Sequence, residues 1–347
     1  ISKQTDFPDT HISDFNETIR HYYANGPRIH EFLREMHEKV LRHYDIMTVG
    51  EGPGIDLQNG LNYVAEDRHE LNMIFHFGHM YIDNGPGGKY DPKPVNLIDF
   101  KNVFTAWDKQ LRRLGWNSIF LGNHDFPRIV SRFGNDDIYR VESAKLLATL
   151  LLTLRGTVYI YQGDEIGMTN VAFESIEDYR DIETLNSWKE AYEAGLDMNE
   201  FMDKVHMQSR DNARTPMQWS TEKYAGFSSV APWLKVNPNY KKINVADQEE
   251  DQHSVLNYYR EMIDFRKEHK VLVYGDYESL DNENDQIYAY RRWDDEEEFL
   301  VIHNFSEHEA AWDYSIKGVF ELVKSNLRTS NHLLNLAPWQ CKILQKK

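Results

Sequence analysis

The sequence predicts an α/β protein in which the strands of a parallel sheet alternate with helices, followed by a small all-β domain. Short apolar runs alternate with helical stretches over residues 44–161, which is typical of β/α units. Three of the four apolar runs end in carboxylates, and catalytic groups follow the strands in β/α barrels. After residue 270 the pattern changes to short strands between turns, which indicates the β domain.

The first part of the chain is expected to be helical. Residues 14–43 have a helical pattern, with Ser13 or Asp14 as the expected N-cap. Residues 25–27, Asn-Gly-Pro, interrupt this pattern and predict a turn between two helices. The apolar run at residues 44–49 then predicts the first strand, which leads into a Gly-Glu pair.

Three further strands and their connecting helices follow in alternation. Strands are predicted at residues 71–77, 117–121 and 157–161. Helices are predicted at residues 101–114 and 141–154. This alternation favours a parallel sheet covered by helices, because parallel strands need long crossover connections.

The remaining residues divide into a long polar stretch, one more helix and the β domain. Residues 165–244 are too long for an ordinary connection, so we expect small elements or a functional loop there. A helix is predicted at residues 255–269. Within the β domain, strands are predicted at residues 286–290, 299–303 and 341–344, and the acidic run at 294–298 is expected at a hairpin tip.

Composition narrows the partners and the compartment. The formal net charge of −17 disfavours nucleic acid and anionic membranes as partners. No apolar run is long enough to span a bilayer. Cys341 is the single cysteine, so no disulfide can form within the chain, and a reducing compartment such as the cytoplasm is expected. These features fit an enzyme that acts on a neutral small molecule.

The carboxylates after the strands suggest acid–base chemistry. Hydrolysis of a glycoside needs a carboxylic acid that protonates the leaving oxygen and a carboxylate on the other side of the sugar ring. Glu51, and Asp125 with the imidazole of His124 beside it, are candidates for such roles. Asp164 and Glu165 are better explained as rim or structural residues. The alternative for each carboxylate is a turn or cap residue, since acidic residues often follow strands.

Three motifs occur in the order of the strand-end motifs of the α-amylase superfamily, and two more resemble motifs of one of its branches. Residues 49–51 (VGE), 122–125 (GNHD) and 161–168 (YQGDEIGM) resemble its strand-end motifs. Residues 209–219 (SRDNARTPMQW) and 232–240 (PWLKVNPNY) resemble motifs of its oligo-1,6-glucosidase branch. Over nearly its whole length, the chain is therefore similar to retaining α-glucosidases of this branch.

The resemblance implies roles for four residues. Glu51 matches the general acid/base, and Asp125 matches the carboxylate that stabilises the transition state. His124 matches the imidazole that hydrogen-bonds the sugar, and Arg210 matches an arginine that orders the same subsite. A structural histidine and a structural ion-pair partner remain the alternatives for His124 and Arg210. We expect no metal ligand and no cofactor.

The nucleophile of the family has no counterpart in this sequence. In the family it is an Asp at the end of the fourth barrel strand, and residues 1–3 (ISK) resemble the sequence just after that motif. The resemblance therefore implies the second half of a (β/α)8 barrel of the TIM type at residues 1–270, followed by a β-sandwich at residues 271–347. We expect the isolated chain to be inactive and to self-associate.

The resemblance implies that the full-length enzyme hydrolyses short α-1,6-linked gluco-oligosaccharides. A sucrose isomerase or another transglucosylase of the same branch is one alternative, because it shares the covalent step and differs in the acceptor of the glucosyl group. A non-catalytic amylase-like binding protein is the other. Loss of the strand-end carboxylates and of the histidine is typical of that class, and this chain keeps Glu51, Asp125 and His124.

Overall fold

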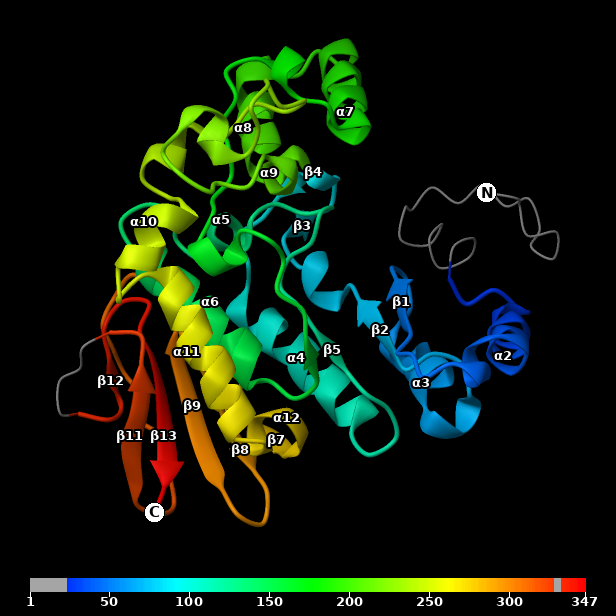
Figure 1. Ribbon diagram of the computed structural model, residues 1–347, viewed down its shortest axis with the longest axis vertical. Coiled ribbons are helices and arrows are strands. Elements are labelled where there is room, and N and C mark those ends of the chain that lie inside the picture. The colour runs from blue at the N-terminus through cyan, green and yellow to red at the C-terminus, as the bar shows by residue number, and fades with distance from the viewer. Residues whose placement is uncertain (1–23, 328–331) are drawn as a thin grey trace.

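The computed structural model describes residues 24–327 and 332–347 (Figure 1). An α/β part, blue to yellow in Figure 1, precedes an antiparallel β domain in orange and red. The strands of the α/β part are β1 (Val49–Gly52), β2 (Met73–His76), β3 (Asn84–Gly85), β4 (Gly88–Pro92), β5 (Ser118–Ile119) and β6 (Thr157–Val158). Its helices are α2 (Ile29–Lys39), α3 (Leu57–Val64), α4 (Leu97–Leu111), α5 (Ile129–Phe133), α6 (Arg140–Thr153), α7 (Ile182–Glu193), α8 (Met198–Gln208), α9 (Asp211–Arg214), α10 (Val245–Glu250), α11 (Val255–Glu268) and α12 (Val271–Tyr274).

Four short parallel strands support the α/β part. β1 pairs with β2, and β5 pairs with β6, both in parallel. The hydroxyl of Ser118 on β5 donates a hydrogen bond of 2.5 Å to the carbonyl of Ile74 on β2 and thereby joins the two pairs. The strands therefore follow one another in chain order, as successive β/α units do.

The prediction of the first strand was wrong over residues 44–48. These residues have no regular structure, and β1 begins at Val49. The side chains of Thr48 and Asn72 bond each other's backbone N–H groups at 2.8 and 3.0 Å, in addition to the main-chain bonds at this end. The other three predicted strands exist but are shorter than expected, because few of their residues pair in a regular ladder.

The predicted helices are confirmed with shifted ends. The helices predicted at 101–114, 141–154 and 255–269 are α4, α6 and α11. α4 begins four residues early, because Asn96 accepts a hydrogen bond from the N–H of Asp99 as its N-cap. α3 was not predicted, although Asp56 caps it in the same way.

The turn predicted at residues 25–27 is present and precedes α2, with Asn25 at a φ of 55°. The predicted helical residues 14–23, with the caps Ser13 and Asp14, lie outside the described residues.

The long polar stretch carries small elements of its own, as predicted. α7, α8 and α9 lie together at the top of Figure 1, beside the β3–β4 hairpin. α7 and α8 contribute to a separate hydrophobic cluster that includes Phe173, Tyr179 and Phe201. The short turns of 3-10 helix in the α/β part are η1 (Leu41–His43), η2 (Glu66–Arg68), η3 (Gly78–Met80), η4 (Asp164–Ile166), η5 (Ile176–Asp178), η6 (Lys223–Gly226) and η7 (Pro238–Lys241).

The β domain is one antiparallel sheet with a short ribbon against it. Its strands are β7 (Asp276–Leu280), β8 (Ile287–Trp293), β9 (Glu298–Asn304), β10 (Ala310–Ala311), β11 (Phe320–Ser325), β12 (Asn335–Leu336) and β13 (Cys341–Lys346). The sheet has the order β11-β13-β9-β8-β7, and β10 pairs with β12. One face packs on the β10–β12 ribbon around Trp312. The acidic run does form the tip between β8 and β9, where the N–H of Asp294 bonds the carbonyl of Glu297 at 3.0 Å.

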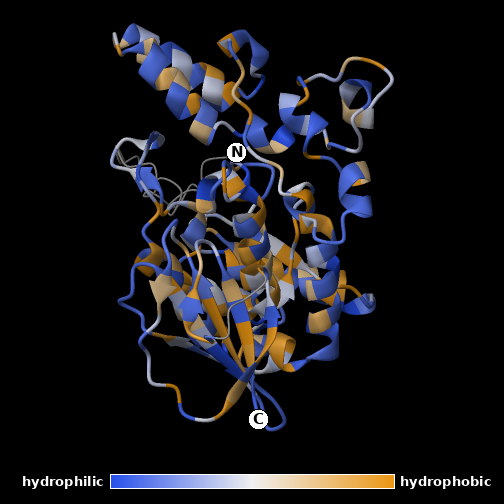
Figure 2. Ribbon diagram, turned by 90° about the vertical axis from the view of Figure 1, so that its left-hand side faces the viewer, coloured by the Kyte–Doolittle hydropathy of each residue, from blue (hydrophilic) through white to orange (hydrophobic). Residues whose placement is uncertain are grey.

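The other face of this sheet shares one hydrophobic core with α6 and α11. Figure 2 shows hydrophobic residues concentrated in this region. The buried Arg292 of β8 closes the junction by donating to main-chain carbonyls on both sides of it, those of Thr153, Val271, Leu272 and Gly275. Among the described residues, no helix is long and apolar enough to cross a membrane.

Candidate active site

The two predicted catalytic carboxylates lie at the carboxyl ends of the parallel strands. Glu51 is the third residue of β1, and Asp125 lies in the loop that follows β5. Glu51 is exposed, and no described residue forms a hydrogen bond with its side chain. A carboxyl group with these surroundings is accessible to a ligand from outside the sheet.

Tyr81, which follows η3, lies close enough to both carboxylates to respond to their charges. Burial, the largest cause, and the negative charges of Glu51 and Asp125 together raise the pKa of Tyr81 to about 12. Its ring packs against Phe77 and Phe126, at centroid distances of 5.9 and 5.8 Å. Tyr81 therefore packs beside the loop after β5 and lies within electrostatic range of Glu51 on β1.

Asp125 is held by two arginines from α9 and its N-cap position. Nη2 of Arg214 donates a hydrogen bond of 2.7 Å to Oδ1 of Asp125, and Nη1 of Arg210 donates a longer one of 3.3 Å to the same atom. The N–H of Asp125 also bonds Oδ1 of Asn123 at 2.8 Å. Charge-assisted bonds of this kind fix the direction of a carboxylate.

His124 has an exposed side chain next to Asp125. Its Nε2 lies 3.5 Å from Oδ2 of Asp125, and 62% of the side chain is accessible. Its carbonyl accepts a hydrogen bond of 2.8 Å from Nε of Arg214. The backbone of His124 is thus fixed, while the imidazole is accessible to a ligand.

Arg210 bonds more closely to Asp181 than to Asp125. Its Nη2 donates to Oδ1 of Asp181 at 2.5 Å, and its Nε lies 3.4 Å from Oε2 of Glu183. The hydrogen bond to Asp181 raises the pKa of Arg210 well above its usual value. Arg210 therefore links Asp125 to the start of α7, where Asp181 is the N-cap.

Sequence analysis missed Arg214 and Tyr81. Arg214 is four residues after Arg210, and residues at this spacing share one face of a helix. The spacing within the motif at 209–219 therefore indicates that Arg214 lies beside Arg210, although the resemblance implies a role for Arg210 alone. No pattern in the sequence pointed to Tyr81, because its position depends on packing between two loops.

Asp164 and Glu165 are not part of this group. Asp164 is 3% exposed, and burial raises its pKa to about 7, against the opposing charge of Arg128. Glu165 accepts a hydrogen bond of 2.6 Å from the N–H of Gly163. The interaction with Arg128 connects Asp164 to the loop after β5, and the hydrogen bond of Glu165 is internal to the loop after β6, in agreement with structural roles.

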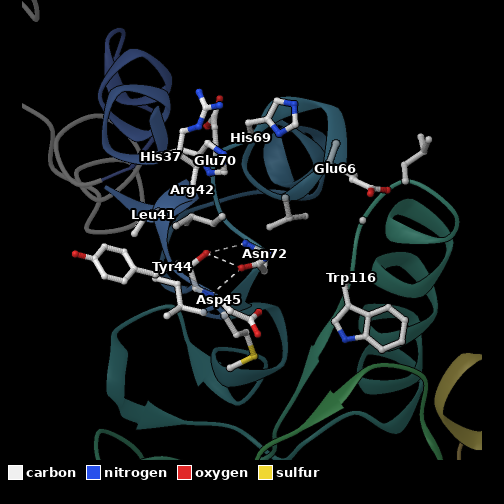
Figure 3. Close-up of a pocket in the computed structure, with 18 of the residues that line it drawn as sticks. His37, Leu41, Arg42, Tyr44, Asp45, Glu66, His69, Glu70, Asn72 and Trp116 are labelled. Atoms are coloured by element: carbon white, nitrogen blue, oxygen red, sulfur yellow. Dashed lines mark hydrogen bonds between the residues drawn. The ribbon is translucent and has the colours of Figure 1, made fainter. Parts of the chain in front are cut away.

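A cleft lies at the opposite end of the strands (Figure 3). It has a volume of about 800 Å³ and is lined by residues just before β1, β2 and β5, including Tyr44, Asn72 and Trp116. Catalytic groups of β/α barrels sit at the carboxyl ends of the strands, so this cleft is not the candidate active site. Within the described parts of the chain, no cluster of three or more His, Cys, Asp or Glu side chains is arranged to hold a metal ion.

Comparison with known proteins assigns the family. Residues 1–275 match the family of α-amylase catalytic domains. The chain belongs to this family. It is 50% identical over 353 aligned positions to an oligo-1,6-glucosidase from Parageobacillus thermoglucosidasius, which covers 99% of the chain and 63% of the relative.

Solved structures of this family show the same fold. An isomaltulose synthase variant from Erwinia rhapontici, in complex with its natural substrate sucrose, is 40% identical with a TM-score of 0.92, covering 99% of the chain and 63% of the other. A trehalose-6-phosphate hydrolase from Bacillus licheniformis is 37% identical with a TM-score of 0.91, covering 100% and 63%. The chain thus spans less than two thirds of the length of these relatives.

Proposed function

We propose that this chain supplies the acid/base and the transition-state-stabilising carboxylate of a retaining α-glucosidase of the oligo-1,6-glucosidase type. The observation that carries the proposal is the arginine-held Asp125, with the accessible imidazole of His124 beside it and with Glu51 near enough for its charge to act on the same Tyr81. The proposed substrates are short α-1,6-linked gluco-oligosaccharides, because the chain is 50% identical to an oligo-1,6-glucosidase.

Each proposed role is the one that the resemblance to the family implies for that residue. Glu51 protonates the glycosidic oxygen and later removes a proton from the attacking water. Asp125 stabilises the positive charge that develops on the sugar ring, and its two arginines keep its oxygens in place for this. His124 donates a hydrogen bond to a sugar hydroxyl. The attacking carboxylate comes from a part of the protein outside this chain.

We further propose that residues 1–270 are the second half of a (β/α)8 barrel and that residues 271–347 form the C-terminal domain. The apolar side of α2 supports this: Phe32, Met36 and Val40 are spaced by four residues and are 49%, 37% and 48% exposed. Within the described residues, β1 has a paired strand on one side only. In the proposal, the rest of the barrel covers these three apolar side chains, and one of its strands pairs with the free edge of β1.

The isolated chain is therefore expected to self-associate in solution. Sedimentation velocity over a range of concentrations should show oligomers, and the double substitution of Phe32→Ser and Met36→Ser should shift the distribution toward monomer. Val230→Ser is the matched control, because Val230 is also exposed, at 69%, but is remote from α2 in the chain. A monomer at all concentrations would contradict the half-barrel proposal.

The protein expressed from its complete gene tests the function. It should release glucose from isomaltose and should convert sucrose and trehalose-6-phosphate much more slowly, as product analysis by chromatography would show. The transglucosylase alternative is favoured by the likeness to isomaltulose synthase and predicts isomaltulose as the main product from sucrose. Binding of isomaltose without any turnover would instead support a non-catalytic protein.

A further inference from the structure

Arg128 is a buried side chain that connects the three segments on which Asp125 and its arginines depend. It lies three residues after Asp125 and is 2% exposed. Its Nη1 donates a hydrogen bond of 2.6 Å to the carbonyl of Gln162, in the loop after β6. Its Nε donates one of 3.1 Å to the carbonyl of Asn212, within α9. One guanidinium therefore ties the loop after β5 to the loop after β6 and to α9.

α9 needs such support because it is a single helical turn. It has four residues, and a helix of this length is unstable without tertiary contacts. Besides the bond from Arg128 to the carbonyl of Asn212, the hydroxyl of Tyr161 donates to the carbonyl of Ala213 at 3.0 Å. The placement of Arg210 and Arg214 around Asp125 thus depends in part on these bonds to the carbonyls of α9, beside those that the buried side chains of Asp211 and Asn212 make with neighbouring segments.

The surroundings of Arg128 are shaped for a planar guanidinium. Gly163 has a φ of 95°, and a Cβ there would lie 2.6 Å from Nη1 of Arg128. The ring of Tyr161 lies 5.6 Å from the guanidinium carbon, and the buried carboxyl of Asp164 stabilises the positive charge. A lysine carries the same charge but cannot reach two carbonyls in the fixed directions of a guanidinium.

We propose that Arg128 is a positioning residue of the candidate active site, which acts through α9 by holding Arg214 and Arg210 against Asp125. The expected effect of Arg128 on catalysis rests on the proposed function, whereas its effect on the position of α9 does not. Arg140 provides a matched control. Its side chain is half-buried and donates to the carbonyls of Ile166 and Gly167 at 3.3 and 3.0 Å, without a hydrogen bond to α9.

The first test compares Arg128→Lys with Arg140→Lys in the complete gene product. A displacement of catalytic groups by about 1 Å can lower the rate about 100-fold, so kcat for isomaltose should fall by about that factor in Arg128→Lys, with little change in KM. Arg140→Lys should retain the kcat of the parent protein, although it should lose about as much thermal stability as Arg128→Lys. If Arg128→Lys keeps its kcat per correctly folded molecule, the inference is wrong.

A double substitution separates positioning from general damage. If Arg128 acts through Arg214, the losses in kcat from Arg128→Lys and Arg214→Gln should not multiply, because the second change removes the group that the first misplaces. Full multiplication of the two losses would show that Arg128 acts by another route and would overturn the inference.

Hydrogen exchange tests the inference without any activity. The N–H groups of Asn212 and Ala213, which lie in α9, bond the carbonyls of Ser209 and Arg210, which precede it. Their exchange should be about tenfold faster in Arg128→Lys than in the parent protein and unchanged in Arg140→Lys. Equal protection in all three proteins would overturn the inference, whereas a parent protein without glucosidase activity would overturn the proposed function instead.

Discussion

Glu51→Gln is expected to abolish most of the isomaltose hydrolysis of the complete gene product. A glutamine has nearly the same shape but cannot protonate the glycosidic oxygen, and general acid–base catalysis contributes about 10²- to 10⁴-fold. The loss should be smaller in the glycosylation step of an aryl α-glucoside with a good leaving group, because that oxygen needs little protonation. Stopped-flow and steady-state assays of both substrates would measure the difference.

Asp295→Asn is the control for Glu51→Gln, because Asp295 is an exposed carboxylate at the β8–β9 tip and should not affect turnover. The isolated 347-residue chain should release no glucose from either substrate, since in our proposal the nucleophile lies outside it and catalytic groups act as a unit. Glu51-dependent hydrolysis by the isolated chain would show that the nucleophile is among residues 1–347.

A loss of stability in acid is expected from His76, at the end of β2. This side chain is 1% exposed and stacks on Trp107 at a ring distance of 4.3 Å. In the described part of the chain, neither of its ring nitrogens has a hydrogen-bond partner. Burial lowers the pKa of His76 from 6.5 to about 3.

The direction of the effect follows from which state binds the proton. Between pH 6.5 and 3 the unfolded chain binds a proton at His76 and the folded chain does not, so stability falls as the pH falls through this window. One pKa unit corresponds to about 1.4 kcal/mol, so the free energy of unfolding should drop by about 2 to 3 kcal/mol between pH 7.5 and 4.5 from this group.

Urea unfolding at pH 7.5 and 4.5 would measure this, with His76→Phe as the test and His308→Gln, at an exposed position, as the control. His76→Phe should show a smaller drop between the two pH values whatever its stability at pH 7.5. The same drop in the parent and in His76→Phe would refute the assignment.

Periodicity was sufficient to predict the long helices and the β domain. α6 and α11 bury apolar side chains over most of their length, so their patterns are strong and their predicted ends are off by one residue. The predicted parallel strands were too long, because only two to four residues of each of β1, β5 and β6 pair in a regular ladder. An apolar run indicates that its residues are buried, which is also true of many residues in loops beside a strand. It does not indicate which backbone N–H and C=O groups form hydrogen bonds with each other.

The candidate site was predictable where its residues stand next to strands in sequence. Glu51 and Asp125 follow that rule, and the arrangement of parallel strands brings both to one edge of the sheet. The same rule does not predict Arg214, Tyr81 and Arg128, because their effect on Asp125 depends on contacts between segments that are separate in the sequence.

The sequence alone determined the α/β class, the family and the strand-end carboxylates, since these depend on residue types and on spacings along the chain. Only the tertiary structure decided that Arg214 lies closer to Asp125 than Arg210 does, at 2.7 against 3.3 Å. It also placed the cleft of about 800 Å³ at the end of the strands opposite to Glu51. The physical reason is that hydrogen-bond lengths and cavities depend on how separate segments pack, and side chains of the same type four residues apart are equivalent until that packing distinguishes them.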